Sequence, residues 1–90
     1  MTNKKDLYLQ LIHKFGIKNQ IIIAIEELSE LQKELCKSLR GERNIRGITE
    51  EIADVEIMLE QLKLLFAIDV MVEIEKDFKL KRTKERYFDK

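Results

Sequence analysis

Two pairs of acidic residues interrupt the apolar pattern of this chain at helical spacing. Glu27 and Glu30 form one pair, and Glu51 and Asp54 form the other. At about 100° per residue, Glu27 and Glu51 fall among apolar residues that should face a core, and Asp54 lies at the edge of that arc. Because burying an unpaired carboxylate is costly, we expect these side chains to have a function.

Four carboxylates from two neighbouring helices can surround one point. Without a cation such a cluster raises its own pKa values, and a divalent cation turns the repulsion into attraction. Oxygen ligands without nearby histidine or cysteine favour Mg²⁺ or Mn²⁺ over zinc, and Mg²⁺ commonly adds phosphate oxygens to its ligands. Glu27, Glu30, Glu51 and Asp54 therefore predict a metal site for a phosphorylated substrate, where a carboxylate and the metal activate water.

Basic residues near the C-terminal end complement this acidic cluster. The apolar residues Val70, Met71, Ile74 and Phe78 predict an inward stripe on the last helix. Cations continue this stripe or lie near the same end: Lys79, Lys81, Arg82 and Arg86. They could hold terminal phosphates, and the alternative is a solvated basic end that interacts with the helix dipole.

The composition predicts an all-α domain that places these residues. The chain has 90 residues, 38% of them charged and 44% hydrophobic, with no proline and three glycines, which is typical of one domain of long helices. We expect a four-helix bundle. The predicted helices cover residues 4–15, 19–40, from 44 or 49 to 66, and 69–87, with Gly41 as a left-handed stop and Asp69 as an N-cap.

Some predicted helices are more apolar than one small bundle requires. Ile21, Ile22, Ile23 and Ile25 surround most of the second helix, and the segment 62–66 does the same near the end of the third. A helix that is apolar on all sides is buried on all sides. We therefore predict an obligate homo-oligomer, most simply a two-fold dimer.

Net charge and cysteine content indicate which kinds of binding partner and which cellular compartment to expect. The formal net charge is zero, which makes nucleic acid an unlikely partner. Cys36 is the single cysteine, so a reducing compartment and a buried thiol are expected. Since no apolar run approaches the roughly 20 residues of a membrane span, we expect a soluble, cytoplasmic protein.

The acidic pairs also resemble a known family. The chain reads EELSEL over residues 26–31 and EEIADV over residues 50–55. This resembles the MazG-like nucleoside triphosphate pyrophosphohydrolases, all-α enzymes whose signature is Glu-x-x-Glu followed, after a variable gap, by Glu-x-x-Asp. Asn19 and Gln20, the segment 57–66 and the basic end look like short bacterial or phage-type members, so the resemblance covers most of the chain.

The resemblance implies Mg²⁺-dependent hydrolysis of a nucleoside triphosphate to the monophosphate and pyrophosphate. Glu27, Glu30, Glu51 and Asp54 would be the metal ligands and catalytic residues. Substrate contacts are implied for Gln20, Lys79, Arg82 and Arg86. Lys79 and Arg86 fit the Lys-x-x-x-Asn-x-x-Arg ending of many relatives, but Thr83 stands where the asparagine would be. The family also forms dimers or dimers of dimers.

Three other functions remain open from the residues. The chain could be a catalytically silent helical oligomerisation or regulatory module with the same fold. It could bind nucleic acid through the loop 40–46 and the C-terminal cations, although the zero net charge argues against this. A di-iron carboxylate site is weaker, because it needs two Glu-x-x-His motifs and His13 is the only histidine.

Overall fold

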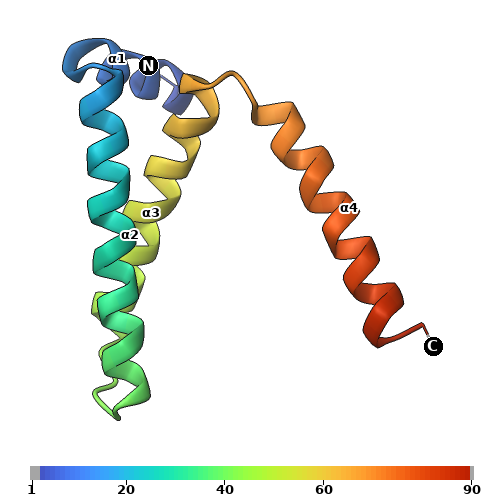
Figure 1. Cartoon of the computed structure of the whole chain (residues 1–90). Coiled ribbons are helices and arrows are strands. Elements are labelled where there is room, and N and C mark those ends of the chain that lie inside the picture. Colours follow the sequence, from blue (N-terminus) through green and yellow to red (C-terminus); the bar gives the residue numbers. More distant parts are fainter. Residues whose placement is uncertain (1–2, 90) are drawn as a thin grey trace.

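The computed structural model describes residues 3–89, which form four α-helices joined by short connections (Figure 1). The helices are α1 Lys4–Phe15, α2 Ile17–Leu39, α3 Ile45–Leu65 and α4 Asp69–Tyr87. The predicted all-α class is therefore confirmed for this part of the chain. The predicted helices are all present, although α2 begins at Ile17, two residues before the predicted start.

Helix α2 ends as its sequence predicts. Gly41 takes a left-handed φ of 89°, a conformation that glycine adopts without steric cost. Its N–H donates to the carbonyl of Ser38, and the N–H of Glu42 donates to the carbonyl of Lys37. This pair of bonds satisfies the last carbonyls of the helix and turns the chain back into α3.

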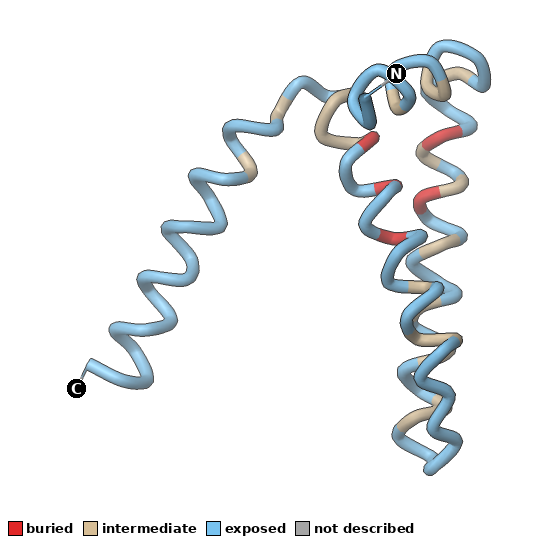
Figure 2. The backbone as a smooth tube through the Cα atoms, turned by 180° about the vertical axis from the view of Figure 1, so that it is seen from behind, coloured by how far each residue is buried: buried red, intermediate tan, exposed pale blue. Residues whose placement is uncertain are grey.

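Helices α2 and α3 run antiparallel and hold the small core (Figures 1 and 2). The buried residues among 3–89 all lie on the facing sides of these two helices. They are Gln20, Ala24, Val55, Met58 and Gln61. Helix α1 lies across one end of this pair and contacts both helices.

Helix α4 diverges from the other helices (Figure 1). Within residues 3–89 it contacts α3 alone among the helices, and none of its residues is buried. Val70, Met71, Ile74 and Phe78 are exposed. The prediction that they form an inward stripe is therefore wrong for a single copy, because the chain does not bring α4 back onto α2 and α3.

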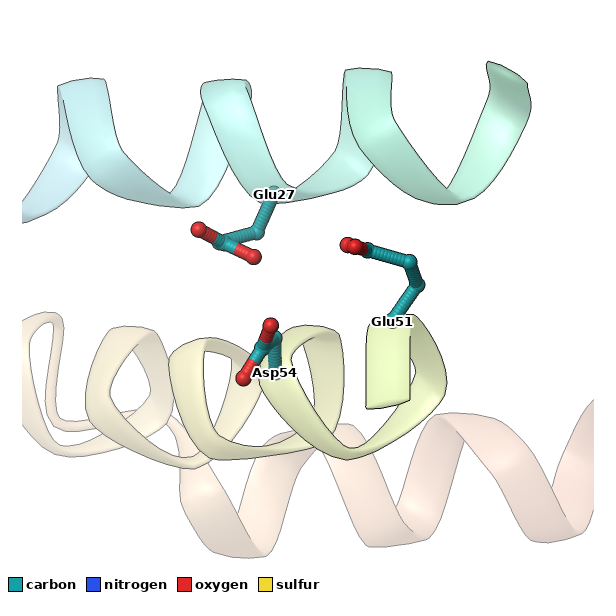
Figure 3. Close-up of side chains that lie close together, drawn as sticks. All are labelled: Glu27, Glu51 and Asp54. Carbon is teal, nitrogen blue, oxygen red and sulfur yellow. The ribbon is translucent and has the colours of Figure 1, made fainter. Parts of the chain in front are cut away.

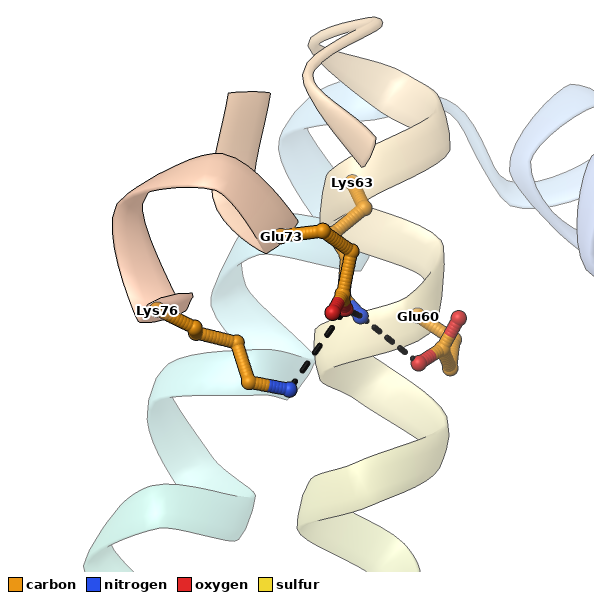
Figure 4. Close-up of polar contacts among 4 residues, drawn as sticks. All are labelled: Glu60, Lys63, Glu73 and Lys76. Carbon is orange, nitrogen blue, oxygen red and sulfur yellow. Dashed lines mark hydrogen bonds and ion pairs between the residues drawn. The ribbon is translucent and has the colours of Figure 1, made fainter. Parts of the chain in front are cut away.

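One ion pair, between Lys63 and Glu73, joins α3 to the beginning of α4, and each of its residues also pairs within its own helix (Figure 4). The ammonium of Lys63 lies 2.9 Å from the Glu60 carboxylate and 3.9 Å from that of Glu73, while Lys76 lies 3.4 Å from Glu73. The hydrogen bond to Glu60 raises the pKa of Lys63. Because Glu73 is exposed and its distance to Lys63 is long, this single pair contributes little to the stability of the contact between α3 and α4.

The connection between α3 and α4 corrects one predicted cap. Ile68 is the N-cap residue of α4, and Asp69 lies in its first turn. Asp69 therefore interacts with the helix dipole instead of capping with its side chain. Just before it, Ala67 adopts a left-handed φ of 55°, which is unfavourable for a residue with a Cβ atom.

Two further observations concern the surface. Cys36 is exposed, so the prediction of a buried thiol is wrong: its position on α2 faces away from α3. Within residues 3–89, none of the helices is long and apolar enough to span a membrane.

Candidate metal centre

Three carboxylates converge between α2 and α3 (Figure 3). Glu27 projects from α2, and Glu51 and Asp54 project from α3. One carboxylate oxygen from each residue lies within 4.8 Å of the others. The i, i+3 spacing puts Glu51 and Asp54 on one face of α3, and the antiparallel packing places Glu27 opposite them.

The surroundings make the ionised forms of two of these carboxylates unfavourable. Partial burial raises the pKa of Glu27, and the charges of Asp54, Glu51 and Glu30 raise it further. Partial burial likewise raises the pKa of Glu51, with the charges of Asp54, Glu30 and Glu34 adding to it. The structure thus contains the self-repelling cluster that the sequence predicts.

An unpartnered oxygen supports the fit to a cation. Oε2 of Glu51 is buried and has no hydrogen-bond partner within residues 3–89. A buried carboxylate oxygen without a donor is unfavourable. An all-oxygen donor set of this kind fits Mg²⁺ or Mn²⁺. A divalent cation between the three carboxylates would offset their mutual repulsion.

Glu30, the fourth predicted ligand, lies outside this group of oxygens. Its side chain is on the exposed side of α2, although its charge still contributes to the raised pKa of Glu27 and of Glu51. Three of the four predicted ligands are therefore brought together, and Glu30 borders the cluster.

Glu34 is a further acidic residue at this site. Its Oε1 lies 3.6 Å from the ammonium of Lys37, an ion pair at the i, i+3 spacing of neighbouring residues on a helix. Its Oε2 is buried without a partner among the described residues, and its charge raises the pKa of Glu51. A signal was present in the sequence, because Glu34 follows Glu27 by two helical turns and so lies on the same face.

Gln20 is part of the core between α2 and α3. Its Nε2 donates to Oε1 of Gln61 at 2.6 Å, and the two residues are only 3% and 2% exposed. The second amide, Nε2 of Gln61, donates weakly to the sulfur of Met58 at 3.7 Å. Gln20 thus packs inside the protein, on the same face of α2 as Glu27.

The predicted phosphate-binding cations do not approach these acids within one copy. Lys79, Arg82 and Arg86 are exposed on the outer half of α4, which diverges from α2 and α3 (Figure 1). Arg82 lies over the ring of Phe78 at 5.6 Å. Thr83 donates its hydroxyl hydrogen to the carbonyl of Lys79 at 2.8 Å, so it is bonded to its own helix.

A large open groove lies on another side of α3. It has a volume of about 1190 Å³ and is bounded by α1, α3 and α4, with Tyr8, Ile57, Leu64 and Val72 in its walls. Glu27, Glu51 and Asp54 do not line it. The candidate metal centre and this groove are therefore separate features of the surface.

Comparison with family models, with curated proteins and with solved structures finds no significant match to this chain. The chemical interpretation of the site accordingly depends on its own residues.

Proposed function

We propose that this protein is a Mg²⁺-dependent nucleoside triphosphate pyrophosphohydrolase of the MazG-like type, active in nucleotide-pool housekeeping. The observation that carries the proposal is the convergence of Glu27, Glu51 and Asp54 from two helices. The arrangement of the acidic pairs along the sequence supports the same proposal. Mn²⁺ is an alternative cation for the same oxygens.

The residues of the chain have distinct roles in the proposed reaction. Glu27, Glu51 and Asp54 would hold the cation. Glu30, at the border of the cluster, adds a negative charge beside it. The cation, when bound, neutralises phosphate charge and lowers the pKa of water. A carboxylate of the cluster orients the attacking water and accepts its proton. Hydrolysis between the α and β phosphates then releases the monophosphate and pyrophosphate.

Substitution of Glu51 tests the proposal. We expect Glu51→Gln to lower pyrophosphate release from a panel of triphosphates by at least about 100-fold, because it removes a metal ligand or base. Circular dichroism should show unchanged helix content. Glu50→Gln is the matched control, since Glu50 is the neighbouring glutamate, exposed and paired with Arg46. Release of single phosphate, or full activity of Glu51→Gln, would contradict the proposal.

A helical oligomerisation or regulatory module without turnover is the second candidate. The position of Lys79, Arg82 and Arg86 away from the carboxylates favours it. Thermal melts separate the two functions, because a ligand that binds the native state raises its transition. A shift with Mg²⁺ and a non-hydrolysable triphosphate supports the enzyme, and no shift at millimolar ligand supports the module.

We further propose that the enzyme is a cytoplasmic homo-oligomer. The single, exposed cysteine suits a reducing compartment. Exposed apolar side chains on α2, α3 and α4 support association. In an oligomer, a second copy can supply the phosphate-binding cations that one copy keeps apart from the carboxylates.

A further inference from the structure

Lys37 is a half-buried cation on α2. Its side chain is 35% exposed, and that of its partner Glu34 is 15% exposed. Among residues 3–89, no other ion pair has both side chains so far from solvent. Lys63 is the other described lysine or arginine that is not exposed, and it lines the groove beside α1 and α4. Because lysine side chains ordinarily extend into solvent, the position of Lys37 calls for a local reason.

Glu34 connects Lys37 to the acidic cluster. Its Oε1 lies 3.6 Å from Nζ of Lys37, while its Oε2 is buried without a partner among the described residues. The charge of Glu34 also acts on Glu51, whose pKa it helps to raise. One carboxylate therefore contacts the lysine and is close enough to the cluster to change its electrostatics.

The alignment of α2 and α3 gives the direction from the cluster to Lys37. Glu27 lies opposite Asp54, and the helices are antiparallel, so Glu51 lies near the level of Glu30. Lys37 follows Glu30 by about two helical turns, on the same side of α2 and about 10 Å further along its axis. Since side chains of a helix lean toward its N-terminus, the ammonium of Lys37 is directed back toward the carboxylates.

The charge of the site favours a cation at this place. A triphosphate is anionic, and the acids around the site carry more negative charge than one divalent cation offsets: Glu27, Glu30, Glu34, Glu51 and Asp54. The basic residues of α4 are on a helix that diverges from these acids (Figure 1). Lys37 is the half-buried cation of the same copy that can attract phosphates extending from the metal toward the C-terminal end of α2.

We propose that Lys37 binds the outer phosphates of the triphosphate. This assignment, which rests on the proposed function, gives one copy a phosphate contact of its own beside the metal centre. An ammonium has three donors, so Lys37 can bond Glu34 and phosphate oxygens at the same time. Glu34 then acts as a positioning residue, because it holds the lysine at the edge of the cluster before substrate binds.

Titration calorimetry with Mg²⁺ complexes tests the role of Lys37. Lys37→Met should weaken the binding of a non-hydrolysable triphosphate and of pyrophosphate by at least about tenfold, the loss expected for one hydrogen bond to a charged group. The binding of a nucleoside monophosphate should change little, because it has no outer phosphates. Lys18→Met is the matched control, since Lys18 is an exposed lysine on the opposite side of α2. It should bind all three compounds as the native protein does.

Titration with Mg²⁺ alone separates a phosphate contact from a structural role. Loss of a cation beside the carboxylates leaves the site more negative, so Lys37→Met should bind Mg²⁺ as tightly as the native protein or more tightly. Lys37→Arg keeps the charge and should keep most of the affinity for the triphosphate. Weaker Mg²⁺ binding in Lys37→Met, or equal losses of triphosphate affinity in both variants, would overturn the proposal.

The outcomes also separate this assignment from the proposed function. If the native protein binds the triphosphate and releases pyrophosphate while Lys37→Met binds as tightly, the proposed function stands and the role of Lys37 is refuted. Lys33 is the exposed lysine one turn earlier on α2, and a loss of affinity in Lys33→Met instead of Lys37→Met would refute it as well. A native protein that binds no triphosphate with Mg²⁺ would refute the proposed function itself.

Discussion

Glu27, Glu51 and Asp54 place carboxylate oxygens within 4.8 Å of one another without a basic side chain among them. Such a cluster favours bound protons or a bound cation over three free charges. The residue types and their i, i+3 spacing predicted this conflict. The contribution of Glu34 was recognised only in the structure, because its ion pair with Lys37 gave its charge an ordinary explanation.

The raised pKa values of Glu27 and Glu51 predict how stability depends on pH in the absence of metal. Between the ordinary value of 4.5 and the raised pKa, the native state holds protons that the unfolded chain has released. The contribution of these two groups to stability is therefore fully present below pH 4.5 and is lost as pH rises through their raised pKa values. We expect the Tm of metal-free protein to fall over this range, and Mg²⁺ to restore it at neutral pH.

The variant Glu51→Gln provides the comparison for this pH dependence. Without metal it should melt at a higher temperature than the native chain at neutral pH, because one repelling charge is gone. The difference should shrink below pH 4.5, where the native carboxyl group is protonated. Equal melting temperatures at neutral pH would contradict the inferred repulsion.

Among the helices, α2 and α3 are held in one alignment by a buried amide pair. The bond from Gln20 to Gln61 lies on the same faces as Glu27 and Asp54, two helical turns away from them. Shifting one helix along the other would leave both amides unpaired in the core. The hydrophobic pattern predicted that these helices pack, but it left their alignment open, because several alignments bury similar apolar area.

The Gln20–Gln61 pair gives a prediction for stability. Gln61→Leu should lower the free energy of unfolding by about 1–3 kcal/mol, because it leaves the Gln20 amide buried without a partner. The double variant Gln20→Leu with Gln61→Leu should recover most of this loss, since both polar groups are removed. Urea denaturation measures both. A double variant as unstable as the single one would show that the unpaired Gln20 amide does not cause the loss of stability.

For the whole molecule, the open position of α4 is the main departure from a closed four-helix bundle. Its apolar residues Val70, Met71, Ile74 and Phe78 lie roughly opposite the side of α4 that lines the groove, where Asp69, Val72 and Lys76 are found. The apolar stripe of an amphipathic helix can be buried by packing within one chain or by packing between chains. The pattern of the sequence is the same in both cases.

Hydrogen exchange should distinguish α4 from the rest of the molecule. Because no residue of α4 is buried within Asp69–Tyr87, its amides should exchange faster than those of α2 and α3. Mass spectrometry of exchanged peptides measures this directly. Protection of α4 equal to that of α3 would show that α4 packs against a further surface in solution.

The sequence by itself determined the helices, the stop at Gly41 and the pairing of acids on two helices, because these follow from local spacing and backbone preferences. Only the tertiary structure decided that Glu27, Glu51 and Asp54 converge while Glu30 borders them, and that Gln20 is buried against Gln61. It also decided that α4 diverges. The physical reason is that distances between helices depend on their alignment and on the surface that each one covers, and local spacing does not contain this information.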